Sequence, residues 1–138
     1  IPEEKRGTAE HRFHLWAYPG ETAVFDCSGP NRIGEGCRVT ADFWHLKGLH
    51  FTKTGGCGIS IVGDHNIVEQ CVASECGNTG IQIWGGRSHN LLLNMPSRAT
   101  FSLDNATANF YMTLRVSDVP VALAQTAWSS TLQEGLLA

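Results

Sequence analysis

The chain has 138 residues, a length that suits a single domain, and a formal net charge of −3 at pH 7. This charge excludes a nucleic-acid binder driven by bulk positive charge, and a hydrophobic content of 42% excludes an acidic disordered chain. No stretch approaches the ~18 consecutive apolar residues of a membrane span, which excludes that class as well.

Glycine is unevenly distributed and marks an internal repeat. Of the 15 glycines, 14 lie within the first 86 residues. Gly36, Gly58 and Gly80 are evenly spaced, and several hydrophobic positions recur with the same period. His65-Asn66 and His89-Asn90 are separated by slightly more than this period, which predicts a two-residue insertion just before the second pair. A fixed period of about 22 residues is typical of a solenoid built from stacked coils.

Short strands are predicted in a fixed order within each repeat, because apolar and polar residues alternate between breaks at glycine or aspartate. The first strands are predicted over residues 37–41, 59–61 and 81–83. The second strands are predicted over residues 44–46, 66–68 and 90–93, and the third over residues 49–51 and 71–73. Two or three short strands in each period favour a parallel β-helix over a leucine-rich repeat, whose leucine/asparagine consensus is absent.

Stacking of equivalent side chains from neighbouring coils accounts for the low charged fraction of 17%. We expect one inward column of Leu15, Cys37, Ile59 and Ile81, and another of Ala17, Val39, Ile61 and Ile83. Asn66 with Asn90, and Gln70 with Asn94, occupy matched positions from which amides can hydrogen-bond between coils. The sequence therefore predicts an all-β parallel β-helix, with about four coils over residues 12–97.

The composition changes near residue 97, beyond which the chain is rich in Ala, Ser and Thr. We predict that residues 1–97 form the coils and that residues 98–138 add a further coil and a capping segment within the same domain. Residues 101–112 loosely repeat residues 81–93, which brings the number of coils to about four or five. An amphipathic helix predicted within residues 120–135 would cover the open end of the solenoid.

Six segments resemble the family-nine polysaccharide lyases, over roughly residues 7–97. These segments are WAYPGET (16–22), DCSG (26–29), FWHLKGL (43–49), GDHNIVEQC (63–71), NTGIQI (78–83) and HNLLLN (89–94). The resemblance implies a secreted, right-handed parallel β-helix pectate lyase that performs β-elimination on polygalacturonate. In that chemistry a bound Ca²⁺ acidifies the C5 proton of the uronate and a lysine removes it.

The sequence departs from this family where the calcium ligands are expected. In the family these acids occur in Ala-Asp-Gly-Phe and Asp-Asp-Gly-Phe-Asp motifs, downstream of the segment equivalent to residues 89–94. After Met95 the chain has no Asp-Gly dipeptide, its only acids are Asp104, Asp118 and Glu134, and no lysine follows Lys53. Catalytic residues are therefore left unassigned, Ca²⁺ rests on the resemblance alone, and no metal site is predicted from the residues.

Four residues are predicted to bind substrate: Lys47, Lys53, Trp84 and Arg87. The three cations could pair with a polyanionic sugar, and Trp84, predicted to point outward, could pack against a sugar ring. The alternative for the cations is a solvated charged face. The expected partner is an acidic, pectate-type polysaccharide. Alternatives to a lyase are a non-catalytic carbohydrate-binding or structural β-helix module, or a truncated lyase fragment.

Other residue types have structural interpretations. The five cysteines allow one bridge in a secreted protein, such as Cys27–Cys37 or Cys57–Cys76, and an odd count leaves a free thiol. His65 and His89 are expected to stack at a corner of the solenoid. The chain starts at Ile1 with no initiator Met or signal peptide, which suggests a processed or trimmed chain. The open end of a solenoid could also stack against a second chain, which predicts end-to-end self-association.

Overall fold

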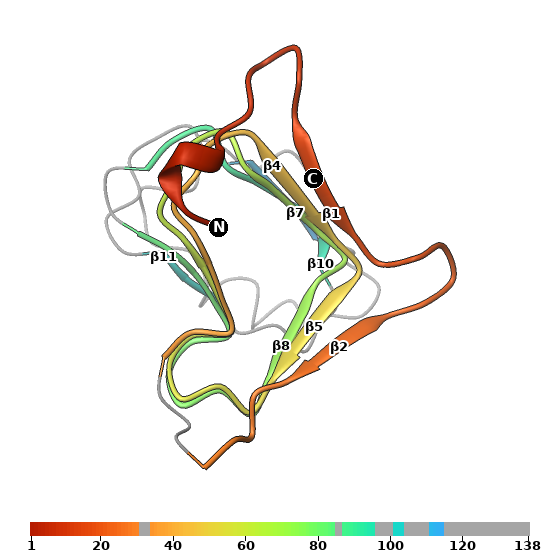
Figure 1. The fold of residues 1–138 in the computed structure, drawn as a ribbon, viewed down its shortest axis with the longest axis vertical. Coiled ribbons are helices and arrows are strands. Elements are labelled where there is room, and N and C mark those ends of the chain that lie inside the picture. Colours follow the sequence, from red (N-terminus) through yellow and green to blue (C-terminus); the bar gives the residue numbers. More distant parts are fainter. Residues whose placement is uncertain (31–33, 85–86, 96–100, 104–110, 115–138) are drawn as a thin grey trace.

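A computed structural model describes residues 1–30, 34–84, 87–95, 101–103 and 111–114 (Figure 1). Over these residues the fold is all-β, apart from one short 3-10 turn, η1 (Glu3–Lys5). The strands are β1 (Phe13–Trp16), β2 (Ala23–Asp26), β3 (Cys37–Val39), β4 (Trp44–Lys47), β5 (Leu49–Thr52), β6 (Ile59–Ile61), β7 (Ile67–Glu69), β8 (Val72–Ser74), β9 (Ile81–Ile83), β10 (Leu91–Met95), β11 (Phe101–Leu103) and β12 (Tyr111–Leu114).

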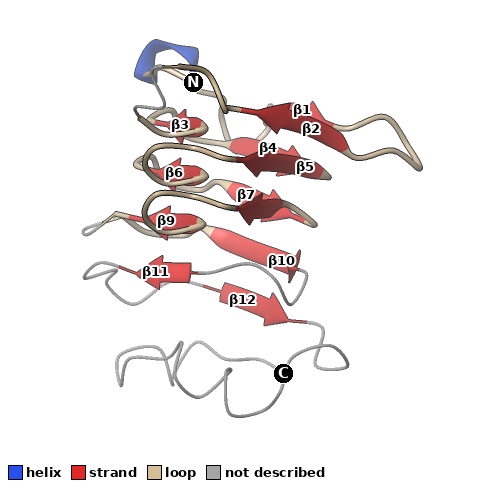
Figure 2. Cartoon of the chain, turned by 90° about the horizontal axis from the view of Figure 1, so that it is seen from below, coloured by secondary structure: helices blue, strands red, loops and turns tan. Residues whose placement is uncertain are grey.

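The strands form three parallel sheets that wind into a solenoid (Figures 1 and 2). Sheet A has the order β1-β4-β7-β10-β12, sheet B has β2-β5-β8, and sheet C has β11-β9-β6-β3. Each of the first three coils contributes one strand to every sheet. Beyond them the structure describes β10 and β11 of the next coil, followed by β12. The predicted all-β parallel β-helix is confirmed.

The register follows the sequence repeat over most of the solenoid. In sheet C, Cys37 pairs with Ile59 and Ile59 pairs with Ile81, which is the predicted period of the repeat. In sheet A, Ile67 pairs with Leu91, which lies beyond the regular period by the predicted two-residue insertion.

The first coil departs from the predicted inward columns. Leu15 pairs with Leu46 in sheet A, and the amide of Ala17 donates to the carbonyl of Lys47 at 2.9 Å. Placing Leu15 and Ala17 in the columns of sheet C is therefore wrong. The physical reason is a longer first coil. Phe13 pairs with Trp44, and these two residues are farther apart in the sequence than paired residues of the later coils, so the regular period does not extend to the start of the solenoid.

Inward side chains from the three sheets form a single core. Its fully or nearly buried members include Val39, Leu46, Leu49, Phe51, Ile59, Ile61, Val68, Ala73, Ile81, Ile83 and Leu92. Cys71 and Met95 are also buried, and burial raises the pKa of the Cys71 thiol to about 11. The core thus explains why these positions are apolar in each repeat.

All five cysteines are free thiols, so neither of the two expected bridges is formed. In the Cys57–Cys76 pair, each sulfur makes a separate hydrogen bond. The Cys57 thiol donates to Oε1 of Gln82 at 2.9 Å, whereas the Cys76 thiol donates to the carbonyl of Ser74 at 3.5 Å.

A buried asparagine ladder lines the corner that leads into sheet A. Asn66 Oδ1 accepts a hydrogen bond from the amide of Trp44 at 2.8 Å, and Asn90 Oδ1 accepts from the amide of Asn66 at 2.9 Å. The side-chain nitrogens donate inward, to the carbonyls of Ala41 and Gly63, each at 3.1 Å. The predicted ladder is confirmed at Asn66 and Asn90, although its bonds run from side chain to backbone and not between the amides.

A stack of rings lies beside this ladder. Phe43, His65 and His89 have φ angles of 59°, 57° and 57°, so each occupies the left-handed region at the same corner of its coil. Their rings stack with centroids 4.6 Å and 4.5 Å apart. The predicted stacking of His65 on His89 is confirmed.

The N-terminal end of the solenoid carries most of the exposed apolar surface. The carbonyl of Ile1 accepts from the amide of Thr40 at 2.9 Å, which covers the outer edge of β3. Six of the seven large hydrophobic residues that are exposed in the described part of the chain lie between residues 13 and 25. End-to-end association through this surface stays a prediction.

Beyond residue 97 the structure describes two strands. Phe101 of β11 pairs with Ile81, and Tyr111 of β12 pairs with Leu91, so both continue existing sheets. The helix expected within residues 120–135 lies outside the described residues, and the division of the chain at residue 97 stays a prediction. Among the described elements there is no helix with the length and apolar character that crossing a membrane requires.

Candidate functional site

The structure places the four predicted substrate-binding residues on different sides of the solenoid. Lys47 ends β4 on sheet A, Lys53 follows β5 of sheet B, Trp84 follows β9 of sheet C, and Arg87 lies in the connection between sheets C and A. Lys47 and Lys53 are also paired internally: their Nζ atoms lie 2.8 Å from Oε1 of Glu69 and 3.1 Å from Oδ2 of Asp26, respectively. The four residues therefore do not form one site.

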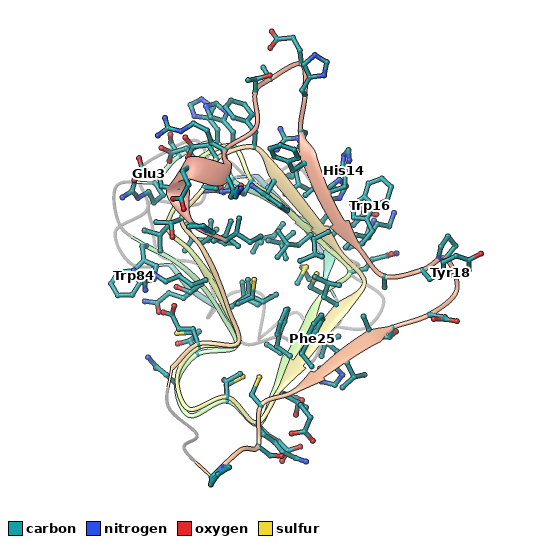
Figure 3. All side chains as sticks on the ribbon, viewed as in Figure 1. Glu3, His14, Trp16, Tyr18, Phe25 and Trp84 are labelled. Carbon is teal, nitrogen blue, oxygen red and sulfur yellow. The ribbon has the colours of Figure 1, made fainter. Side chains whose placement is uncertain are left out.

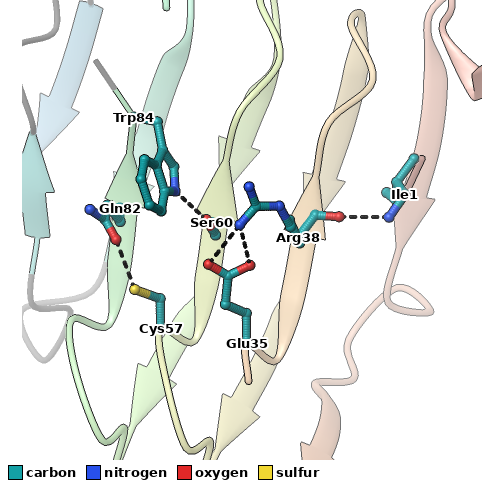
Figure 4. Close-up of polar contacts among 7 residues, drawn as sticks. All are labelled: Ile1, Glu35, Arg38, Cys57, Ser60, Gln82 and Trp84. Carbon is teal, nitrogen blue, oxygen red and sulfur yellow. Dashed lines mark hydrogen bonds and ion pairs between the residues drawn. The ribbon is translucent and has the colours of Figure 1, made fainter. Parts of the chain in front are cut away.

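The outer face of sheet C gathers polar and aromatic groups around Trp84 instead (Figure 4). Arg38 of β3, Ser60 of β6 and Gln82 of β9 are register partners, so they form one outward column across three coils. Parallel strands lie ~4.8 Å apart, which sets the spacing of the side chains in this column.

The indole of Trp84 folds back over this column. Its Nε1 donates to Oγ of Ser60 at 2.6 Å, and the guanidinium carbon of Arg38 lies 5.4 Å from the ring centroid. Trp84 remains 37% exposed. The hydrogen bond and the cation–π contact fix the orientation of the ring and leave part of it accessible to a ligand.

Neighbouring groups hold Arg38 and Gln82 in place. Nη1 of Arg38 donates to both carboxylate oxygens of Glu35, at 3.2 Å and 3.1 Å, and the side chain of Arg38 is 49% exposed. Burial raises the pKa of the Cys57 thiol, so the sulfur keeps its proton and donates it to Gln82. We name Arg38, Ser60, Gln82 and Trp84 the Trp84 site.

The Trp84 site offers the groups that bind an acidic sugar. An accessible indole can pack against the C–H face of a pyranose ring, and a guanidinium can pair with a carboxylate through two parallel hydrogen bonds. The sequence prediction included Trp84 but missed Arg38 and Gln82 as its neighbours. The repeat itself carried the missing signal, because residues 38, 60 and 82 recur with the same period as the core positions.

The described residues do not fit a calcium site. Ca²⁺ takes 6–8 oxygen ligands, usually including several carboxylates. Across the part of the chain that the structure describes, no three His, Cys, Asp or Glu side chains converge as metal ligands would. Asp42 and Asp64, stacked at one corner, already accept backbone hydrogen bonds from Asp64 and Ser88 at 2.8 Å and 2.7 Å.

A solenoid of three parallel sheets with this repeat defines the class of parallel β-helix proteins. Residues 1–111 match the family described as "Pel9A-like, right handed beta helix region". The chain belongs to this family of right-handed β-helices, which confirms the resemblance stated above.

Individual relatives are pectate lyases by name. The chain is 36% identical over 93 residues to "Pectate lyase L" of Thermoclostridium stercorarium, a match that covers 66% of this chain and 7% of that protein. It is 37% identical over 76 residues to "Pectate lyase L" of Dickeya dadantii, with 52% and 18% covered. It is 35% identical over 79 residues to "Pectate disaccharide-lyase" of Dickeya chrysanthemi, with 51% and 10% covered.

The matched segment is thus a small part of each relative, between 7% and 18% of its length. No solved structure matches the chain.

Proposed function

We propose that this chain is a carbohydrate-binding part of a pectate-lyase-like β-helix, and that its Trp84 site binds an acidic, pectate-type polysaccharide. The observation that carries this proposal is the packing of Arg38 against the partly exposed Trp84 on a regular parallel sheet. Membership of the Pel9A-like family, and relatives named pectate lyase, support the choice of polysaccharide.

The shape of the surface suits a linear polymer. The outward column of Arg38, Ser60 and Gln82 runs across successive coils, parallel to the axis of the solenoid. Ser60 is fully buried and accepts its hydrogen bond from the indole, so a polysaccharide lying along this axis meets Arg38, Trp84 and Gln82. In this arrangement Arg38 pairs with a uronate carboxylate, Trp84 packs against the adjacent sugar ring, and Gln82 hydrogen-bonds to a hydroxyl.

Titration calorimetry with trigalacturonate tests the site. We expect Trp84→Ala to weaken binding by about tenfold, the effect of losing roughly 1.4 kcal/mol of aromatic contact. Arg38→Gln should weaken binding of trigalacturonate but leave any binding of neutral galactotriose unchanged. Lys5→Gln, which removes one positive charge at an exposed position of η1, is the matched control. Equal affinities of the wild type, Trp84→Ala and Arg38→Gln for trigalacturonate would contradict the proposal.

Catalysis by β-elimination, which the resemblance implies, is a second proposal and rests on membership of the family. The described residues do not supply the calcium ligands, so catalytic residues stay unassigned. The test is the absorbance of the unsaturated product in the near ultraviolet, measured on polygalacturonate with added Ca²⁺. Without a rise in absorbance, the alternatives are a non-catalytic binding or structural module, or a fragment of a lyase.

We also propose that the protein acts outside the cell, because a polysaccharide is too large to cross a membrane unaided. Fractionation of cells that express the natural gene, followed by detection with an antibody against this chain, tests the location. Recovery only from the cell interior would contradict it.

A further inference from the structure

The outer face of sheet A carries a second group of chemically active side chains, separate from the Trp84 site. It consists of His14 and Trp16 from β1, His45 and Lys47 from β4, and Glu69 from β7, which we name the Glu69 cluster. Figure 3 shows His14 and Trp16 on the outer side of β1, pointing away from the core. Trp84 lies on the opposite side of the solenoid in the same view.

Two donors hold the carboxylate of Glu69. Its Oε2 lies 2.9 Å from Nε2 of His45, and its Oε1 lies 2.8 Å from Nζ of Lys47. The side chains of Glu69 and His45 are only 14% and 13% exposed. The hydrogen bond from Lys47 lowers the pKa of Glu69, so this carboxyl group is ionised at neutral pH.

Trp16 provides the exposed surface of the cluster. Half of the residue, 51%, is exposed to solvent. Nζ of Lys47 lies 5.7 Å from its ring centroid, and the ring of His45 meets it edge-on at 5.1 Å. The ring of His14 lies 4.5 Å from the indole and 5.7 Å from the ring of His45, so the three rings contact one another. A half-exposed indole with an ammonium group over its ring is a surface suited to a sugar that carries a carboxylate.

The charges of the cluster depend on His45. Burial lowers the pKa of His45, so at neutral pH the imidazole is uncharged and the charges of Lys47 and Glu69 cancel. When His45 takes up a proton, its positive charge balances the negative charge of Glu69. The positive charge of Lys47 is then no longer cancelled, and the cluster as a whole is positive. The groups that face one another here are His14, His45, Lys47 and Glu69.

We propose that the Glu69 cluster is a binding site for a carboxylated sugar, in which Trp16 packs against the ring, Lys47 binds the carboxylate, and protonation of His45 strengthens binding by neutralising Glu69. The site lies on a different sheet from the Trp84 site and does not depend on it. A uronate carboxyl, with a pKa near the ~3.5 of an α-carboxyl group, stays ionised while histidine gains its proton. Binding therefore tightens as the pH falls from about 7.5 to about 5.

The test is titration calorimetry of the full 138-residue chain with trigalacturonate, carried out in a Trp84→Ala background so that binding at the Trp84 site is weakened equally in every variant. Galactotriose is the neutral control ligand. At about pH 5 we expect Lys47→Gln to weaken binding roughly fivefold and Trp16→Ala to weaken it about tenfold. Lys5→Gln, the same charge change at an exposed position of η1, should have no effect.

Two further variants separate the proposed gating from a merely structural role. Glu69→Gln removes the anion that competes for Lys47, so it should strengthen binding at about pH 7.5 by roughly fivefold and reduce its pH dependence. His45→Gln keeps a hydrogen-bond donor for Glu69 but cannot gain a proton, so it should lose most of the tightening between about pH 7.5 and about pH 5. His14→Gln is the control for the neighbouring imidazole.

Several outcomes would overturn the proposal. These are an absence of binding at about pH 5 in the Trp84→Ala background, unchanged affinity in Lys47→Gln and Trp16→Ala, or weaker binding in Glu69→Gln. Far-UV circular dichroism identifies any variant that fails to fold, and Lys47→Arg, which keeps the charge, should restore binding that Lys47→Gln loses. Because Trp84 is absent throughout, a failed Trp84 site leaves this result unaffected.

Discussion

Asn66 and Asn90 lie one above the other in neighbouring coils, and Oδ1 of Asn90 accepts a hydrogen bond from the backbone amide of Asn66 at 2.9 Å. Both residues are almost completely buried, at 0% and 2% exposure. Each side chain also donates to a carbonyl of the preceding corner. The ladder satisfies backbone groups that the corner takes out of sheet pairing, so it links the coils where strands do not.

Replacing Asn66 with alanine should destabilise the protein by about 2–4 kcal/mol, because it leaves the amide of Trp44 and the carbonyl of Ala41 without their side-chain partners. Each such buried group costs roughly 1–3 kcal/mol. Urea unfolding followed by circular dichroism measures the loss. Asn78→Ala, at an exposed asparagine in the same stretch of chain, is the control. Equal stability of the two variants would contradict this account of the ladder.

Gly63 should not tolerate a side chain, although its backbone does not require glycine for its conformation. A Cβ atom built at Gly63 would lie 2.1 Å from the carbonyl oxygen of Ala41 in the neighbouring coil. That oxygen belongs to the backbone, so Gly63→Ala must push the two coils apart. We expect a loss of at least about 2 kcal/mol in the free energy of unfolding.

Gly29→Ala is the matched control, because a Cβ atom there meets nothing within 4 Å. It should change stability by less than about 0.5 kcal/mol. A similar loss of stability in both variants would show that the neighbouring coil does not exclude a side chain at position 63.

The sequence repeat predicts the fold well where each coil has the same length. The positions of Ile59 and Ile81, and the ladder of Asn66 and Asn90, follow directly from the spacing. Leu15 is misplaced because the first coil is longer, and no local pattern in the sequence reports the length of a loop. For the site, the sequence does not show that carboxylates from other coils pair with Lys47 and Lys53, and the binding roles of Lys47, Lys53, Trp84 and Arg87 stay predictions.

The carboxyl group of Asp26 accepts hydrogen bonds that predict a low pKa. Hydrogen bonds from Ser28 and then Lys53 lower the pKa of Asp26 to about 2. A depressed carboxyl pKa stabilises the folded state above the unfolded value of roughly 3.9, and this contribution is lost as the pH falls toward about 2. Carbon-detected NMR titration of the carboxyl group should therefore show a midpoint well below roughly 3.9.

Lys53→Gln should raise the pKa of Asp26 only in part, since the backbone amide of Ser28 still donates to Oδ1 at 2.9 Å. Lys47→Gln on sheet A should leave the titration of Asp26 unchanged. An ordinary pKa for Asp26 in the wild type would show that the exposed pair does not persist in solution.

The N-terminal end of the solenoid should drive self-association. Leu15 and Phe25 are 36% and 42% exposed, although their register partners Leu46 and Phe51 are buried in the core. The inward side chains of sheets A and B are therefore exposed at this end of the solenoid, where β1 and β2 are the edge strands of their sheets. Exposed edges and apolar surface of this kind favour pairing with another chain.

Sedimentation velocity over a range of concentrations should show a reversible oligomer. Leu15→Lys should shift the equilibrium toward the monomer, because the new charge would be buried in the contact. Tyr18→Lys is the control, since Tyr18 is 76% exposed in a loop, and it should leave the equilibrium unchanged. A monomer at every concentration would contradict association through this end, and equal effects of the two lysines would place the contact elsewhere.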